Sequence, residues 1–212
     1  MSRTRVKICG ITNVEDARLA VRCGADAIGV IMYPPSPRCA DIEAFAEIRR
    51  AVPAFVTLTL VSVDLDRETH NCWIKAGNPD ILQFHGEESP EHASSFNLPY
   101  IKSLRMRDDV DIAEAERQYG DAKALLLDTY VAGTVGGTGK QFDWRQALKV
   151  QRLPVVLAGG LDATNIGSAI DAVQPFAVDV SSSLEAEPGI KNHQAMREFF
   201  DAVHTADSAR NF

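Results

Sequence analysis

The sequence predicts an α/β protein, a single-domain (β/α)8 TIM barrel that takes in residues 1–212. Two observations predict it. Short β-branched or apolar runs alternate with amphipathic stretches, and this alternation is typical of parallel strands joined by helical crossovers. Eight such units fit into 212 residues, near the short end for this fold. A doubly wound sheet is the weaker alternative, because it usually has about five or six strands.

The predicted strands share a short apolar run bounded by polar or turn residues. They cover residues 5–9, 26–31, 55–61, 80–84, 99–103, 124–128, 154–158 and 176–180. The predicted helices share apolar positions at helical spacing, and they cover residues 14–24, 41–52, 66–77, 89–96, 108–120, 162–173 and 192–206. Asn13, Asp41 and Ser89 are the expected N-caps, and Gly24 is an expected C-cap. Residues 143–150 give the weakest helix.

The composition limits the class of partner. A net charge of −7 disfavours nucleic acid and anionic membranes, but a local pocket can still be positive and bind a small anionic substrate. We see no apolar run long enough for a membrane helix and no export signal, so we expect a cytoplasmic protein. The four cysteines, Cys9, Cys23, Cys39 and Cys72, form no metal-binding pattern, so we expect reduced thiols and no metal.

The carboxyl ends of the predicted strands identify the candidate site residues, because barrels of this class carry their sites there. The candidates at or after these ends are Cys9, Arg38, His85, Lys102, Asp128, Gly159, Gly160, Asp179, Ser181, Ser182 and Ser183.

The last two strand ends suggest a phosphate site. Gly159 and Gly160 let the backbone approach a ligand closely, and Ser181, Ser182 and Ser183 offer hydroxyl donors beside them. Each feature alone is equally typical of a tight turn or a solvated loop. On adjacent loops of one barrel, they favour an anion site.

The glycine-rich stretch GTVGGTGKQFDW, residues 133–144, is not a mononucleotide-binding loop. The first glycine of that motif falls on Thr134, and Gln141 stands where Ser or Thr is required. We interpret the stretch as a lid over a substrate, with a plain surface loop as the alternative.

Cys9 and Asp128 are the candidate acid and base. A cysteine at this position is most often a small buried side chain, whereas an aspartate ending the apolar run ALLLDT needs a partner or a function. One acid and one base across a pocket suit proton transfer by an isomerase or lyase. His85 is an alternative base but fits an orienting role better, and Arg38 matches a carboxylate or remains a solvated arginine.

Seven motifs occur in order along nearly the whole chain: KICGIT, SPR, QFHG, LLLDT, GGTGKQFDW, LAGGL and DVSSS. With them the sequence resembles the phosphoribosylanthranilate isomerases of tryptophan biosynthesis. The resemblance implies an Amadori rearrangement of N-(5′-phosphoribosyl)anthranilate to 1-(o-carboxyphenylamino)-1-deoxyribulose 5-phosphate, without a metal or organic cofactor. It also implies a monomer or a homodimer.

The resemblance implies a role for each matching residue. Asp128 would be the general acid that opens the furanose ring, and Cys9 the general base that removes the C2′ proton. Arg38 would bind the anthranilate carboxylate, and the loops at Gly159–Gly160 and Ser181–Ser183 would bind the phosphate. A base role needs the thiol pKa of Cys9 lowered, and Lys7, two residues earlier on the same strand face, is the candidate cation. Alternatively, Lys7 pairs with a carboxylate such as Asp179.

Three departures from the family pattern bear on affinity. Ser183 and Asn192 stand where the family usually has Gly and Asp, and the third strand ends in the unusual LVSVDLD. The alternatives are a diverged sugar-phosphate-binding barrel without turnover, the related histidine-pathway isomerase, which uses two aspartates, and a redox-sensing thiol protein. Cys9 disfavours the second, and the lack of a nearby resolving cysteine disfavours the third.

Overall fold

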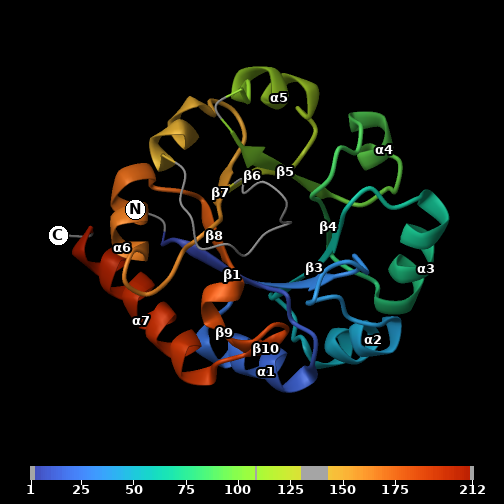
Figure 1. The fold of residues 1–212 in the computed structure, drawn as a ribbon, viewed down its shortest axis with the longest axis horizontal. Helices are drawn as coiled ribbons and strands as arrows, with labels where there is room; N and C mark the ends of the chain where they lie inside the picture. The colour runs from blue at the N-terminus through green and yellow to red at the C-terminus, as the bar shows by residue number, and fades with distance from the viewer. Residues whose placement is uncertain (1–2, 108, 130–142, 211–212) are drawn as a thin grey trace.

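The computed structural model describes residues 3–107, 109–129 and 143–210. In these ranges eight parallel strands close into a barrel in the order β1 to β8, with β8 paired to β1. Figure 1 looks along the barrel and shows the ring of strands at the centre with the helices around it. The predicted (β/α)8 barrel is confirmed.

The barrel strands all coincide with predicted ones. They are β1 (Arg5–Cys9), β2 (Ala27–Ile31), β3 (Thr57–Ser62), β4 (Ile81–Phe84), β5 (Tyr100–Met106), β6 (Ala124–Thr129), β7 (Val155–Leu157) and β8 (Ala177–Val180). Most boundaries agree within one residue, and two differ by more. β3 begins late because Phe55 has a left-handed φ of 70°, which interrupts the extended chain. β5 extends beyond its prediction because Arg105 and Met106 still pair with β6.

The outer helices are α1 (Val14–Cys23), α2 (Ile42–Ala51), α3 (Arg67–Gly77), α4 (Pro90–Ser94), α5 (Ile112–Gln118), α6 (Ile166–Val173) and α7 (His193–Ala209). The side chains of Asn13, Asp41 and Ser89 cap α1, α2 and α4 as predicted, and Gly24 ends α1 with a φ of 103°. The weakly predicted segment after β6 is a 3₁₀ helix, η1 (Trp144–Lys149).

A small hairpin after β8 was not predicted. The short 3₁₀ helix η2 (Ser182–Leu184) leads into β9 (Glu185–Glu187) and β10 (Ile190–Lys191), an antiparallel pair. Gly189 turns the chain between them with a φ of 86°. Figure 1 shows this hairpin beside α1 and the start of α7. The hairpin thus carries Glu185 and Lys191 back to the end of the barrel.

Strand alternation decides which side chains face the barrel interior. On β1, Val6 and Ile8 join the large core cluster with the helices, whereas Lys7 and Cys9 have the opposite parity and point inward. A separate apolar cluster fills the barrel below the site, made of Ile101, Ala124, Leu126, Val156, Ala158 and Ala177. Among the helices that the structure describes, none has the length and apolar character that crossing a membrane requires.

Candidate active site

A cavity opens at the carboxyl ends of the strands, with an empty volume of about 780 Å³ counted out to solvent. Its lining combines polar groups with apolar side chains from β2, β3 and the loop after β2. The lining residues are Cys9, Ile31, Tyr33, Ser36, Arg38, Val61, Val63, Gln83, His85, Asp128, Ala158, Gly159, Gly160, Leu161, Asp179, Val180, Ser181, Ser182 and Ser183. Of the candidates at the predicted strand ends, all but Lys102 lie in this lining.

Cys9 ends β1 and is 7% exposed. It pairs in register with Gly29 of β2. A Cβ atom on Gly29 would lie 2.9 Å from Cys9 Sγ and 3.0 Å from Lys7 Nζ, so the missing side chain leaves room for both. The thiol and the ammonium group therefore share one part of the barrel interior.

The pKa of the Cys9 thiol depends on burial and on its charged neighbours. Burial raises this pKa, the charge of Lys7 opposes the rise, and Asp179 adds to it. The field of Lys7 that the sequence suggested is present, but burial outweighs it, so the pKa lies above its ordinary value.

Lys7 also pairs with Asp179, as the alternative interpretation proposed. β1 and β8 bring the two residues into register, and Lys7 Nζ lies 2.9 Å from Asp179 Oδ2. Burial raises the pKa of the Asp179 carboxyl, and Lys7 opposes that rise. The second oxygen, Oδ1, is buried and has no hydrogen-bond partner among the described residues. Lys7 thus serves both neighbours, Cys9 and Asp179.

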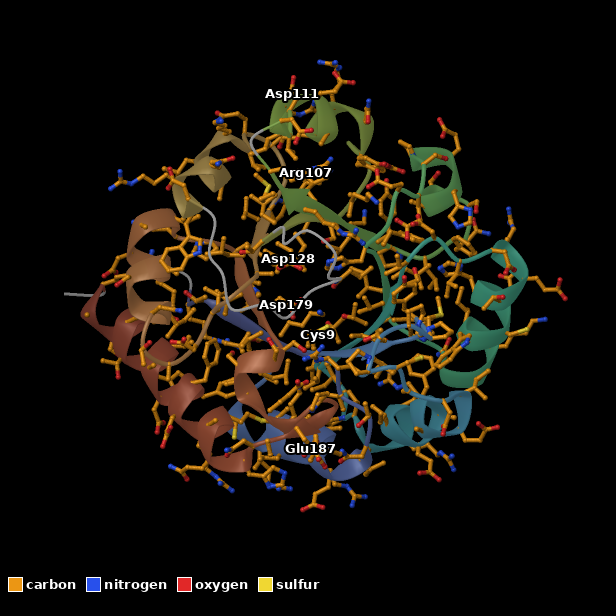
Figure 2. The ribbon with its side chains drawn as sticks, viewed as in Figure 1. Cys9, Arg107, Asp111, Asp128, Asp179 and Glu187 are labelled. Atoms are coloured by element: carbon orange, nitrogen blue, oxygen red, sulfur yellow. The ribbon has the colours of Figure 1, made fainter. Side chains whose placement is uncertain are left out.

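Asp128 ends β6 at 8% exposure. Its Oδ2 lies 3.2 Å from Nε2 of His85, whose Nδ1 lies 3.2 Å from the amide of Gln83. Ser103 Oγ also contacts His85 Nε2, at 3.3 Å. His85 therefore connects Asp128 to Gln83 and Ser103. Figure 2 shows Cys9, Asp128 and Asp179 gathered near the middle of the barrel.

Two glycines give the cavity its shape. Gly159 has a φ of 83°, and a Cβ there would lie 2.7 Å from Asp128 Oδ1. Gly10, directly after Cys9, has a φ of 71°, and a Cβ there would lie 2.9 Å from both Arg38 Cδ and Ser181 Oγ. Side chains at either position would collide with the candidate site residues.

The loop after β8 differs in detail from the expectation of three free hydroxyls. Ser183 Oγ donates to the carbonyl of Leu161, which ties this loop to the loop after β7. Ser181 Oγ is buried without a partner among the described residues. Ser183 stands where the family usually has Gly, but its φ is not positive, so its backbone does not require glycine. Asn192, the other departure, caps α7 by accepting from the N–H groups of Gln194 and Ala195.

Arg38 lines the cavity, but its guanidinium already holds a carboxylate of the protein. Nε lies 2.8 Å from Glu185 Oε1 and Nη2 lies 2.8 Å from Oε2. Glu185 in turn accepts from the buried Lys191 at 3.0 Å. Burial raises the pKa of Glu185, but Arg38 and Lys191 together outweigh it and hold that pKa below its usual value.

Sequence reasoning missed four polar residues of this region: Gln83, Ser103, Glu185 and Lys191. Gln83 could have been found, because it has the same strand parity as His85. Glu185 and Lys191 lie in an unpredicted hairpin, so the sequence carried no signal that they meet Arg38. The glycine-rich stretch proposed as a lid lies outside the described residues, apart from its last two positions.

Lys102 was a candidate that the structure places elsewhere. It shares strand parity with Tyr100 and Leu104, away from the inward-pointing Ser103. Its Nζ donates to Glu88, at 2.9 Å, and to the carbonyl of Gly86. This lysine therefore supports the loop after β4 from outside the barrel.

Comparisons with known proteins identify the family of this chain. The family described as N-(5′-phosphoribosyl)anthranilate isomerase matches residues 6–202. A relative of that name from Pseudomonas fluorescens (strain SBW25) is 47% identical, covering 99% of this chain and all of the relative. The phosphoribosyl anthranilate isomerase structure from Thermotoga maritima has a TM-score of 0.88 at 38% identity, covering 95% of this chain and 99% of that one.

A second solved structure of such an isomerase contains reduced 1-(o-carboxyphenylamino)-1-deoxyribulose 5-phosphate. It has a TM-score of 0.84 at 37% identity and covers 95% of this chain and 99% of its own. The match extends over the strand ends that carry the candidate residues. The chain therefore belongs to the N-(5′-phosphoribosyl)anthranilate isomerase family.

Proposed function

We propose that this protein is an isomerase that catalyses the Amadori rearrangement of N-(5′-phosphoribosyl)anthranilate in tryptophan biosynthesis. The observation that carries the proposal is the placement of Cys9 and Asp128 in one cavity, from two strands separated around the barrel by β7 and β8. An acid and a base on different strands reach two different atoms of one substrate, which the rearrangement requires.

Asp128 acts first, as general acid. Its carboxyl proton goes to the furanose ring oxygen, the C1′–O bond breaks, and the nitrogen lone pair forms the Schiff base. His85 holds Oδ2 of Asp128, so the other oxygen, Oδ1, is directed toward Gly159 and the cavity. This arrangement fixes the direction of proton transfer before the substrate arrives.

Cys9 acts second, as general base. Its thiolate removes the C2′ proton, and the electron pair moves through C1′ to the iminium nitrogen to give an enolamine, which tautomerises to the ketone. No external oxidant or reductant is needed, because C1′ gains the electrons that C2′ loses. Lys7 stabilises the thiolate, and this stabilisation must overcome the burial that raises the thiol pKa.

The anionic groups of the substrate have matching partners. Gly159 and Gly160, both with positive φ, border the proposed phosphate site together with Ser181, Ser182 and Ser183, of which Ser181 Oγ is unpartnered among the described residues. Lys191 supports this loop from beneath, with Nζ 3.1 Å from the Ser181 carbonyl. The carboxylate of the anthranilate ring faces Arg38. Asp179 completes the set by keeping Lys7 charged beside Cys9.

We also propose that residues 1–212 act as one domain and that the protein works in the cytoplasm, where free thiols such as the four described here persist. The Thermotoga maritima relative is described as dimeric. We propose a monomer or homodimer for this chain, which sedimentation velocity would distinguish.

Steady-state turnover tests the function. Freshly prepared phosphoribosylanthranilate loses its fluorescence on conversion, and wild-type protein should convert it rapidly. Cys9→Ser and Asp128→Asn should each lower kcat by roughly 10²–10⁴-fold, since each removes one proton-transfer group. Cys23→Ser, at a thiol on α1, is the matched control and should retain turnover. A folded wild type without turnover would favour the alternative, a diverged sugar-phosphate-binding barrel.

A further inference from the structure

Glu185 is the buried carboxylate nearest the cavity that the mechanism does not use. It begins β9, its side chain is 5% exposed, and it does not belong to the described cavity lining, although its partner Arg38 does. Its carboxylate accepts from Arg38 and Lys191 at the same time. A buried carboxylate with two cationic partners behind a ligand-binding side chain controls the geometry of that side chain.

The contact between Glu185 and Arg38 leaves one edge of the guanidinium for a second anion. An arginine has five N–H donors in a planar fork. Glu185 takes the side edge, with 2.8 Å from Nε to Oε1 and 2.8 Å from Nη2 to Oε2. The end edge, formed by Nη1 and the second N–H of Nη2, can still bind a carboxylate in the same two-point manner.

Lys191 fixes the other side of this pair. Its side chain is fully buried, and Nζ donates to Glu185 Oε1 at 3.0 Å and to the Ser181 carbonyl at 3.1 Å. The backbone N–H of Lys191 donates to the buried carboxylate of Asp16, which anchors the hairpin to α1. Glu185 is therefore held by a buried lysine whose backbone is tied to α1, so the orientation it gives to Arg38 is defined before any ligand binds.

We infer that Glu185 is a positioning residue, which holds the guanidinium of Arg38 so that its end edge receives the anthranilate carboxylate of the substrate. This inference deepens the proposed function and rests on it. An arginine fixed in advance loses less side-chain entropy on binding than a free one. Glu185 therefore determines the selectivity for a carboxylated aromatic amine, without touching the substrate.

The test compares two ligands that cannot turn over. One is reduced 1-(o-carboxyphenylamino)-1-deoxyribulose 5-phosphate, and the other is the same molecule without its carboxyl group. The ratio of their affinities, measured by calorimetry, isolates the carboxylate contact from the phosphate contacts. In the wild type we expect this ratio to be at least about tenfold, since charge-assisted hydrogen bonds are among the strong ones.

Glu185→Gln keeps the shape of the side chain and removes its charge. It should reduce the affinity ratio by at least about fivefold, while the affinity for the ligand without a carboxyl group changes little. Glu185→Asp, which keeps the charge on a shorter side chain, should restore part of the ratio and serves as the second variant if the first does not fold. Asp80→Asn is the control, because it breaks the remote Arg49–Asp80 ion pair, which is 2.9 Å long.

Three outcomes would overturn the inference while leaving the proposed function standing. They are an unchanged ratio, an equal loss of affinity for both ligands, or a gain in affinity for the carboxylated ligand. The last would mean that Glu185 competes for Arg38. A wild type that binds neither ligand would overturn the proposed function and the inference with it.

Discussion

Two buried lysine–carboxylate pairs of the barrel, Lys102–Glu88 and Lys7–Asp179, have the same N–O distance of 2.9 Å but different surroundings. Around Glu88 the polar groups are paired, because its oxygens accept from Lys102 and from the backbone N–H groups of Asp64 and Gly86. Around Asp179 they are not, since Oδ1 has no partner within the described residues. The complete pair lies outside the cavity and the incomplete one inside it.

The difference in hydrogen bonding indicates a structural role for Lys102–Glu88 and a role in the site for Lys7–Asp179. A fully paired buried carboxylate holds loops in place, and removing one partner leaves an uncompensated charge. An incompletely paired one costs stability unless it serves a ligand or a neighbouring group. Lys7 has such a neighbour in Cys9, whereas Lys102 lies over the ring of Tyr119 at 5.4 Å.

The largest effect is expected at the complete pair. Lys102→Met should lower the free energy of unfolding by about 3–5 kcal/mol, because it strands the buried carboxylate of Glu88. Turnover by the folded fraction should stay close to that of the wild type. Urea unfolding and steady-state kinetics would check both values. The double variant Lys102→Met/Glu88→Gln should recover part of the stability. If Lys102→Met instead lost kcat without losing stability, the Lys102–Glu88 pair would have no purely supporting role.

At the incompletely hydrogen-bonded pair, Lys7–Asp179, a substitution should lower kcat/KM more than it lowers stability. Lys7→Met removes the cation that opposes the raised pKa of Cys9, so less thiolate forms, and we expect kcat/KM to fall roughly 100-fold. The sign of the pH dependence follows. Because the thiol pKa of the free protein lies above its ordinary value of about 8.5, kcat/KM should rise into alkaline pH.

The pH profile distinguishes this cause from a loss of folding. In Lys7→Met the alkaline rise should move to higher pH, whereas a variant that is merely less stable would keep the profile of the wild type. The measurement is kcat/KM against pH for both proteins. Profiles with the same midpoint would show that Lys7 does not act on Cys9.

A smaller effect is expected from two matched glycines. Gly159 and Gly24 both have positive φ, so alanine at either position carries about 1–2 kcal/mol of backbone strain. Only at Gly159 would the new Cβ press on Asp128, while Gly24 has open space around it. Gly159→Ala should therefore lower kcat by at least about tenfold, and Gly24→Ala should not change it. Equal kcat values in the two variants would mean that Asp128 tolerates displacement.

The sequence was informative where one local rule decides the outcome. Short apolar runs located every barrel strand, and the capping residue types located the N-caps at Asn13, Asp41 and Ser89. The rule that sites lie at strand ends brought Cys9 and Asp128 to one cavity. It failed for Lys102, because a lysine near a strand end can face either side and only the parity relative to its neighbours decides which.

The remaining contacts depend on residues far apart in the chain. Arg38 and Glu185 are separated by 147 positions, and Lys191 reaches Glu185 only because the turn at Gly189 pairs β10 with β9. The net protonation of Cys9 depends on how deeply the closed barrel buries it, which no local pattern reports. Charge neighbours could be read from the sequence, but the balance between charge and burial could not.

The smallest predicted effect concerns His70, a buried residue of α3 outside the cavity. The ring is fully buried, Nδ1 lies 3.0 Å from the Asp66 carbonyl, and Nε2 lies 2.9 Å from Ser62 Oγ. Those partners match a neutral ring that donates from Nδ1 and accepts at Nε2. Burial lowers the pKa of His70, with His92 adding to the decrease and the Asp66 carbonyl and Glu88 opposing it.

The sign of the stability effect follows from proton binding. Below its ordinary pKa of about 6.5 the unfolded histidine takes up a proton that the folded one refuses, so stability should fall as the pH drops from 7.5 to 5.5. For one group the change should be roughly 1 kcal/mol. His70→Gln removes this pH-dependent contribution to stability, so the difference between wild-type and variant urea midpoints should shrink on acidification. If that difference is the same at both pH values, His70 takes up its proton in the folded protein as readily as in the unfolded chain, and burial does not keep this ring neutral.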